Sequence, residues 1–264
     1  MPTNSGATKG RAERIFAVCG KGGVGKTAFT AMFTKALLDS GKAGRLLVID
    51  ADPALGLTNA LGMRIERTMG QVREGIINAA RSGNNTELAE LTNTLDYLVM
   101  EALAESDRLA LLAMGRSESL GCFCPVNDLL RDAIKLLSSR FDTILIDGEA
   151  GLEQINRQVM DELDCLIMLT DTSTRGLQTV SLLKDIVEDK KIIRCKKAGV
   201  VFNRVQDNEE ILNQSAERLG VEVLGFIPQD SRITDFDLIG RSLRELPPES
   251  VALSAVQEIV DSFF

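Results

Sequence analysis

Histidine is absent from the 264 residues of this chain. Without an imidazole group, acid–base catalysis by histidine is excluded, and so is every metal site that has histidine ligands. A metal ion bound by side chains must therefore be held by cysteine thiolates or by carboxylates.

Long apolar runs and an export signal are missing as well. No stretch approaches the roughly 18 apolar residues that a membrane-spanning helix needs. Residues 1–14 are polar, whereas a signal peptide has an apolar segment near its start. We therefore expect a cytoplasmic protein, and in that compartment five cysteines argue against a framework of disulfides.

The chain also has no excess of positive charge. Its 30 Lys and Arg residues against 38 Asp and Glu residues give a net charge of −8. No sequence-wide attraction to nucleic acid or to anionic lipid follows from this balance, and we expect neither nucleic acid nor a membrane as a partner. The length and the hydrophobic fraction of 44% are sufficient for one large α/β domain.

Short apolar segments alternate with segments of helical periodicity. Strands are expected at Ile15–Cys19, Leu46–Asp50, Tyr97–Met100, Thr143–Asp147, Cys165–Thr170, Gly199–Phe202 and Val223–Ile227. Helices are expected at Thr27–Ser40, Asn127–Ser139, Thr174–Asp189 and Glu209–Leu219. Strands that are apolar throughout and separated by helices indicate a mostly parallel sheet covered on both faces. The sequence thus predicts a doubly wound α/β fold.

No repeat, low-complexity tract or linker divides the chain. We expect residues 1–12 to form a flexible tail and residues 13–264 to form a single domain. Residues 63–121 are the least regular part, and we expect them to carry features specific to this protein.

A glycine-rich loop follows the first predicted strand. Glycines let backbone N–H groups curl around phosphate oxygens, and the positive end of the following helix adds to the attraction. Lys26 is expected to reach the β- and γ-phosphates of a nucleotide, and Thr27 is expected to bind Mg²⁺ through its hydroxyl. The loop fits the pattern G-x-x-x-x-G-K-[ST] and consists of Gly20, Lys21, Gly22, Gly23, Val24, Gly25, Lys26 and Thr27.

The segment KGGVGKT resembles the deviant Walker A loop of the MinD/ParA/nitrogenase-iron-protein group of ATPases. The resemblance covers nearly the whole chain. It implies a P-loop NTPase fold, hydrolysis of ATP to ADP and phosphate with Mg²⁺, and a homodimer. It also implies that Lys21 is catalytic beside Lys26, because the first lysine of such loops reaches across the dimer interface to the partner's nucleotide.

Three carboxylates end predicted strands, at the edge where ligands bind in open α/β sheets. They are Asp50 and Asp52 in LVIDADP, and Asp147 in TILID. The resemblance implies that Asp52 is catalytic and positions the attacking water, and that Asp147 holds Mg²⁺ through water. Asp50 is expected near the Mg²⁺ in a supporting role. The alternative for each is a helix cap, since aspartate often caps the helix that follows a strand.

Asn203 and Arg204 follow the strand expected at Gly199–Phe202, and they resemble the adenine-binding Asn-Arg pair of the same group. Pro228, in the turn IPQD, is expected to flank the base. An asparagine side chain offers both a donor and an acceptor, which suits the edge of adenine. The alternative is an ordinary turn after a strand.

Cys122 and Cys124 form a C-x-C pair within residues 114–127, a segment that we interpret as a metal-binding and interface loop. Two thiolates supply half of a tetrahedral site for Ni²⁺ or Zn²⁺. Two such loops on the axis of a homodimer would complete the site, with the metal between the subunits. Two partly buried structural cysteines, or a regulatory disulfide, are the alternatives.

The surroundings of this pair resemble the CooC proteins, ATPases that help to load nickel into carbon monoxide dehydrogenase. The shared elements are MGRSE at 114–118, the C-x-C pair, and the acidic stretch DGEAGLE at 147–153. The resemblance implies a metallochaperone ATPase with carbon monoxide dehydrogenase as its client. Gly148 stands where an asparagine is expected, and residues 154–157 lack an expected histidine, so another metalloenzyme stays open as the client.

Two other functions stay open. In a redox protein like the nitrogenase iron protein, the thiolates would hold a [4Fe–4S] cluster between subunits, although that group takes its cysteines from separate loops. A MinD-like positioning ATPase would end in a basic amphipathic helix. Residues 249–264 have apolar positions at helical spacing, but their charges are acidic, so we expect this helix to pack on the sheet.

Overall fold

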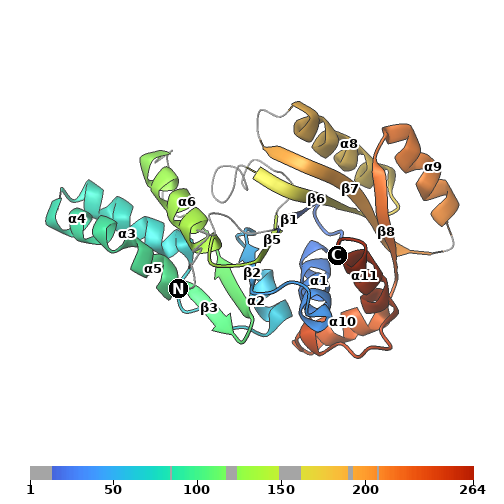
Figure 1. The fold of residues 1–264 in the computed structure, drawn as a ribbon, viewed down its shortest axis with the longest axis horizontal. Helices are drawn as coiled ribbons and strands as arrows, with labels where there is room; N and C mark the ends of the chain where they lie inside the picture. Colours follow the sequence, from blue (N-terminus) through green and yellow to red (C-terminus); the bar gives the residue numbers. More distant parts are fainter. Residues whose placement is uncertain (1–13, 84, 117–123, 149–161, 190–192, 207) are drawn as a thin grey trace, which may run out of the picture.

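An eight-stranded sheet forms the centre of the computed structural model, which describes residues 14–83, 85–116, 124–148, 162–189, 193–206 and 208–264. The strand order is β3-β4-β2-β5-β1-β6-β7-β8 (Figure 1). Only β3 runs antiparallel to its neighbour among these strands, and it lies at one edge. The doubly wound, mostly parallel α/β fold predicted from the sequence is therefore confirmed.

The central strands are buried along their whole length, because helices cover both faces of the sheet. Their apolar residues therefore run on without alternating with polar ones. The strands are β1 (Arg14–Cys19), β2 (Leu46–Asp50), β3 (Leu103–Ser106), β4 (Leu109–Ala113), β5 (Thr143–Asp147), β6 (Glu162–Thr170), β7 (Arg194–Val205) and β8 (Glu222–Pro228).

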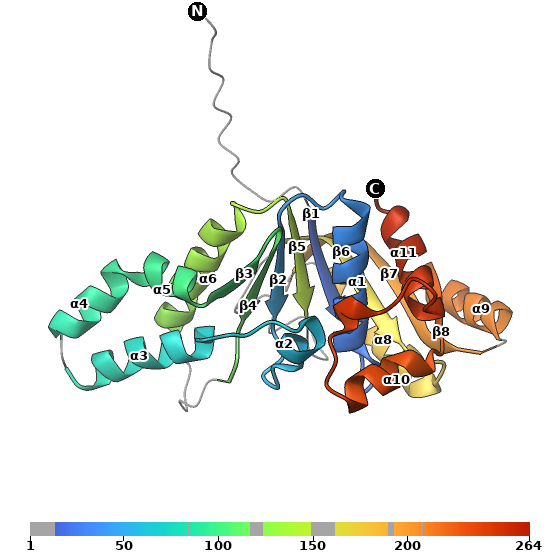
Figure 2. The same cartoon turned by 90° about the horizontal axis from the view of Figure 1, so that it is seen from below.

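The helices form a layer on each face (Figures 1 and 2). One layer contains α1 (Lys26–Ser40), α2 (Gly56–Leu61), the 3₁₀ helix η1 (Leu243–Glu245) and α11 (Val251–Asp261). The other contains α3 (Met69–Arg81), α5 (Leu95–Glu101), α6 (Cys124–Ser138), α8 (Thr174–Asp189) and α9 (Glu209–Leu219). Two more helices pack on these layers, α4 (Asn85–Asn93) on α3 and α10 (Ser231–Leu238) on η1.

The last helix, α11, packs against α1 and β8. Its buried residues are Ala252, Leu253, Val256, Ile259 and Val260, which lie on one face of the helix. The expectation that this amphipathic segment covers the sheet is confirmed. Among the described residues, no helix is long and apolar enough to cross a membrane.

The prediction of a strand at Tyr97–Met100 is wrong, because these residues lie inside α5. Leu95 and Val99, four residues apart, are buried, while the Tyr97 side chain between them is 64% exposed. This spacing places the two buried residues on one face of a helix. A short apolar run does not distinguish a strand from a buried helical turn. The strand that occupies this part of the sheet is β4, whose five residues are all buried and were not predicted.

The expected metal-binding loop at 114–127 lies only partly within the described structure. Met114, Gly115 and Arg116 follow β4, and Cys122 lies outside the described residues. Cys124 is the first residue of α6, so the second half of the C-x-C pair belongs to a helix rather than to a loop. The tail expected at residues 1–12 also lies outside the described residues.

Candidate functional site

The residues predicted to bind nucleotide and Mg²⁺ meet at one edge of the sheet, where the parallel strands end. The glycine-rich loop connects β1 to α1. Asp50 ends β2 and is paired in register with Asp147 at the end of β5, and Asp147 is in turn paired with Val18 of β1. Asn203 lies near the end of β7, and Pro228 ends β8. Chain segments more than 200 residues apart thus contribute to one site.

The loop from Gly20 to Thr27 curls around the side chain of Lys26. The Lys26 Nζ donates hydrogen bonds to the carbonyl oxygens of Gly20 at 3.1 Å and Lys21 at 3.4 Å. Gly23 and Gly25 have φ angles of +82° and +91°, a region that glycine enters without steric cost. The loop therefore places a positive charge inside a ring of backbone groups, next to the N-terminus of α1, as an anion site requires.

Asp147 is buried beside this loop, and one of its oxygens, Oδ2, has no hydrogen-bond partner among the residues that the structure describes. Its Oδ1 accepts a hydrogen bond from the Thr30 hydroxyl at 3.1 Å. The pKa of Asp147 is raised to about 7, mainly by burial and also by the nearby Asp50 carboxylate, whose effects exceed those of the hydrogen bonds from the Thr27 and Thr30 hydroxyls, which lower it. A buried carboxylate with an unused oxygen, next to a threonine hydroxyl, fits an oxygen-liganded cation such as Mg²⁺.

Thr30 was not predicted as a site residue. It lies one turn after Thr27 on α1 and is fully buried, so its hydroxyl needs an acceptor inside the protein. A hydroxyl residue inside an apolar helical stretch indicates a buried hydrogen bond, and this pattern in the sequence could have identified Thr30.

Asp50 supports the segment that carries Asp52. The Asp50 Oδ1 accepts a hydrogen bond from the backbone N–H of Asp52 at 3.1 Å, and its Oδ2 accepts one from Leu57 at 3.2 Å. Burial raises the pKa of Asp50 to about 6. Both oxygens are thus engaged with the backbone, and the bond from Leu57, in the first turn of α2, fits the helix-cap alternative. A supporting or direct role of Asp50 in a Mg²⁺ site stays a prediction.

Asp52 begins a tight turn that leads to α2. Its Oδ1 accepts a hydrogen bond from the Ala54 N–H at 2.9 Å, which stabilises the turn, and the N-cap position of α2 is occupied by Leu55 rather than by Asp52. Leu55, in the same turn, adopts a φ of +56°, which costs a leucine about 1–2 kcal/mol. Such strain is found where the surrounding structure fixes the backbone for a functional reason. The water-positioning role of Asp52 stays a prediction.

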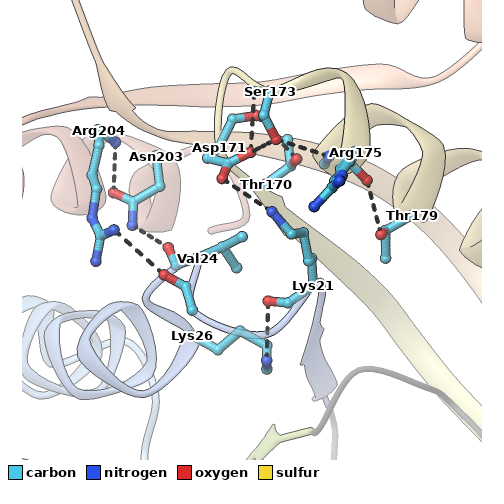
Figure 3. Close-up of polar contacts among 12 residues, drawn as sticks. Lys21, Val24, Lys26, Thr170, Asp171, Ser173, Arg175, Thr179, Asn203 and Arg204 are labelled. Carbon is cyan, nitrogen blue, oxygen red and sulfur yellow. Dashed lines mark hydrogen bonds and ion pairs between the residues drawn. The ribbon is translucent and has the colours of Figure 1, made fainter.

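Lys21 forms an ion pair within its own chain. Its Nζ lies 3.7 Å from Oδ2 of Asp171, and the two side chains are 36% and 32% exposed (Figure 3). Asp171 follows directly on β6 and also accepts a hydrogen bond from the backbone N–H of Ser173 at 3.1 Å. Asp171 was not predicted, although its position after an apolar strand is the same signal that singled out Asp147.

A cavity of about 340 Å³ lies beside the loop and is lined by Gly25, Asn203, Arg204 and Pro228. The apolar side chains of Met32 and Ile233 complete much of its wall. The three residues expected to contact a nucleobase are thus brought together in one cavity next to the phosphate loop. Contact with adenine itself stays a prediction.

Three cysteines have side chains that the structure describes, Cys19, Cys165 and Cys195, and all three are free thiols. Cys19 and Cys165 are buried, and burial raises the pKa of each thiol to about 12. Within the residues that the structure describes, no three Cys, Asp or Glu side chains are grouped to hold a metal ion. The predicted Ni²⁺ or Zn²⁺ site depends on Cys122 and Cys124, and it stays a prediction.

The sequence has relatives among nucleotide-binding proteins. The family model of the CobQ/CobB/MinD/ParA nucleotide binding domain matches residues 15–243. An uncharacterized ATP-binding protein of Methanocaldococcus jannaschii is 38% identical over 251 residues, or 94% of this chain and 97% of that protein. The carbon monoxide dehydrogenase accessory protein CooC of Rhodospirillum rubrum is 32% identical over 88% of this chain and 90% of its own length.

Solved structures show the same architecture. The cell division ATPase MinD of Pyrococcus furiosus superposes with a TM-score of 0.68 at 25% identity, over 95% of this chain and 98% of that chain. The ParA family ATPase from Chlorobium tepidum superposes with a TM-score of 0.71 at 20% identity, over 96% of this chain and 99% of that chain.

Proposed function

The chain belongs to the CobQ/CobB/MinD/ParA nucleotide-binding family of ATP-hydrolysing P-loop proteins, and from that premise we propose a specific role. It is a homodimerising Mg²⁺-dependent ATPase that serves as an accessory factor in the maturation of a metalloenzyme. Its cargo metal is Ni²⁺ or Zn²⁺, held between the two subunits by the C-x-C pairs, and its client is carbon monoxide dehydrogenase.

The nucleotide part of the proposal is supported by the arrangement at the sheet edge. In this proposal Lys26, which lies within the loop, and the N–H groups of the loop bind the phosphates of ATP, and the cavity beside Asn203 and Pro228 takes the base. Mg²⁺ would supply charge neutralisation on the β- and γ-phosphates. Thr27 and the unpartnered oxygen of Asp147 are the groups that would hold it.

The dimer part of the proposal is supported by Lys21. Its side chain is partly exposed at the mouth of the loop, and its ion pair with Asp171 is a partly solvated one, which contributes little to stability. Lys21 can therefore leave Asp171 at small cost and reach a nucleotide in a second subunit. ATP then favours the closed dimer over separate chains because it contributes contacts only there.

The observation that carries the accessory role is the similarity to CooC over 88% of the chain, together with the C-x-C pair. Two thiolates per subunit complete a four-sulfur site only when two copies meet. ATP-driven closing and opening of the dimer would then control when the metal is bound and when it is released to the client.

Anaerobic titration of the purified protein with Ni²⁺ and with Zn²⁺, with and without MgATP, tests this role. We expect one metal ion per two chains, bound together with a dimer on sizing, and loss of the metal in Cys122→Ser and in Cys124→Ser. Cys195→Ser is the matched control, because this half-buried cysteine of β7 is expected to leave the metal content unchanged. Equal metal content in all three variants would refute the interface site.

A MinD-like positioning ATPase is the second candidate, favoured by the structural likeness to MinD. In α11 the side chains of Ala252, Leu253, Val256, Ile259 and Val260 are buried, and the helix packs against α1 and β8. Val251, at the start of the helix, is exposed, but a single exposed valine does not make an apolar face that could bind a membrane. ATP-dependent co-sedimentation with anionic liposomes would decide for this candidate, and we expect none. A brown anaerobic preparation with thiolate-to-iron absorption would instead indicate a nitrogenase-like cluster.

A further inference from the structure

The end of β7 reaches back onto the phosphate loop through two consecutive side chains (Figure 3). The Asn203 Nδ2 donates a buried hydrogen bond to the Val24 carbonyl oxygen at 2.8 Å. The Arg204 Nη1 donates a weaker one, at 3.4 Å, to the carbonyl of Gly23. Two neighbouring carbonyls of the loop are therefore held by two neighbouring residues of a strand that lies some 180 residues later in the chain.

Both ends of the Asn203 amide are engaged in this arrangement. Besides the bond to Val24, its Oδ1 accepts a hydrogen bond from the backbone N–H of Arg204 at 3.0 Å. The side chain is only 7% exposed, and its orientation is fixed by one buried and one partly buried hydrogen bond. An amide fixed in this way has its strongest contacts with the protein, and it has fewer groups left for the edge of a nucleobase.

The backbone around Arg204 is adapted to the same contact. Arg204 adopts a φ of +58°, which is unusual for any residue other than glycine. It does so where the register between β7 and β8 shifts, and such bulges redirect side chains at functional sites. A strained backbone conformation persists only where other contacts stabilise it. At Arg204 one such contact is the hydrogen bond between the guanidinium and the loop.

The loop is adapted from its own side at Gly25. A Cβ atom at this position would lie 2.8 Å from Nδ2 of Asn203, closer than carbon and nitrogen normally approach. The last glycine of the motif is therefore required by the Asn203 contact as well as by its φ of +91°. The loop and the strand end fit each other closely.

These contacts set the direction of the donors that the loop offers. In a trans peptide the C=O and the following N–H point in opposite directions. Holding the carbonyls of Gly23 and Val24 toward β7 therefore turns the N–H groups of Val24 and Gly25 away from β7. Backbone N–H groups are the donors with which such a loop binds phosphate.

We propose that Asn203 and Arg204 are positioning residues that hold the phosphate loop in its anion-binding conformation. This inference rests on the proposed ATP site, and it assigns to Asn203 a task other than reading the base. The two assignments differ in what they require of the ligand, because a clamp on the loop acts on any polyphosphate, whereas a base reader acts only on a nucleotide with the right base.

The test compares Mg²⁺-tripolyphosphate, MgATP and MgITP as ligands in calorimetric titrations of the full chain. Asn203→Ala is expected to weaken tripolyphosphate and ATP by the same factor, about tenfold, because the Val24 carbonyl loses its buried donor. The ratio of ATP to ITP affinity is expected to stay as in the wild type. Asn213→Ala makes the same chemical change on the exposed face of α9 and is expected to change none of these affinities.

Asn203→Asp is the second variant, in case the alanine variant does not fold. It keeps the size and the Oδ1 acceptor of the side chain but replaces the donor by an oxygen that repels the Val24 carbonyl, so it should weaken both ligands at least as much. Unchanged tripolyphosphate affinity in folded variants, with or without a loss of ATP affinity, would overturn the clamp. A wild-type protein that binds neither ligand would instead refute the ATP site itself.

Discussion

At the scale of single residues, the site is dominated by two buried carboxylates at neighbouring strand ends. Asp50 and Asp147 are paired in register, and each is almost completely buried. The charge on one disfavours the charge on the other, and burial disfavours both. Two such groups destabilise the fold when they are ionised, and a bound cation relieves this cost.

The stability of the protein without Mg²⁺ and nucleotide should therefore decrease as the pH rises. The pKa of Asp147 is raised from 3.8 to about 7 and that of Asp50 to about 6, so the folded state binds protons more tightly than the unfolded state in this range. Urea denaturation in EDTA should show a free energy of unfolding larger at about pH 5 than at about pH 8, by on the order of 2 kcal/mol.

In the Asp147→Asn variant this side chain is uncharged at every pH. In EDTA the substitution is therefore expected to remove most of the pH dependence of stability. Stability that increases between about pH 5 and about pH 8 would contradict the account, and so would an asparagine variant that is less stable than the wild type at the higher pH.

Thr30 should matter for turnover more than for nucleotide affinity. Thr30→Val keeps the shape of the side chain but leaves Oδ1 of Asp147 without its 3.1 Å hydrogen bond. We expect kcat for ATP hydrolysis to decrease about tenfold, as for the loss of one buried hydrogen bond to a charged group. The ATP dissociation constant should change little. Thr34→Val is the control, since the Thr34 hydroxyl donates to the backbone carbonyl of Thr30 at 2.8 Å rather than to a carboxylate of the site. An equal loss in both variants would contradict the assignment.

Most of the site residues were predictable individually, because motif and strand-end position are both visible in the sequence. Lys26, Asp147 and Asn203 lie where the sequence places them. The pairing of Asp147 with Thr30 and of Lys21 with Asp171 was not predictable, because the two members of each pair belong to different segments of the chain and only the fold brings them close. The hydrogen bonds of the Asn203 amide likewise depend on the positive φ angle of Arg204, which the type of this residue does not predict.

At the scale of elements, the junction between α10 and α11 depends on one aspartate. Asp230 caps α10 by accepting from the Arg232 N–H at 3.0 Å, and its other oxygen accepts from the Ser250 hydroxyl at 2.7 Å. Ser250 in turn caps α11 through the Leu253 N–H. One buried carboxylate thus fixes the starts of two helices, one beside the base cavity and one on the back of α1.

Asp230→Ala should therefore destabilise the protein by about 2–3 kcal/mol, since it removes a cap and leaves a buried hydroxyl without its acceptor. Burial acts to raise the pKa of Asp230, but hydrogen bonds from Ser250 and from backbone N–H groups outweigh burial, and the pKa is lowered. The contribution of Asp230 to stability is therefore present at neutral pH and is lost as the pH falls through that lowered value. Thermal or urea unfolding measures the effect.

Asp235→Ala is the matched control, because this aspartate is exposed on the same short helix and is expected to change stability by less than about 0.5 kcal/mol. Equal effects of the two substitutions would show that Asp230 has no special role.

Elements of strong pattern were predicted with accurate bounds, whereas those of the irregular segment were not. Thr174–Asp189 and Glu209–Leu219 match α8 and α9 in full, because their apolar residues recur at the helical period. Tyr97–Met100 and the missed β4 lie close together in the chain, and both are short apolar runs. Which of the two runs becomes a strand depends on which one pairs with β2 in the sheet. That pairing is a property of the whole sheet and cannot be predicted from either segment alone.

At the scale of the whole molecule, the account requires two copies of the chain. Lys21 lies at the exposed mouth of the loop, paired with Asp171 across a partly solvated gap of 3.7 Å. This pair belongs to the separate chain. In the proposed dimer Lys21 instead contacts the nucleotide of its partner, so hydrolysis becomes a property of the pair of chains. The cysteine pair has the same requirement, since neither subunit alone supplies four thiolates.

The most direct test is the ATPase activity per chain, measured over a wide range of protein concentration. We expect this specific activity to rise with concentration to a plateau, because the active species is the dimer. Lys26→Ala should abolish activity at every concentration, and Lys21→Ala should remove the concentration-dependent rise. A specific activity that is the same at all concentrations, and is retained in Lys21→Ala, would contradict the account.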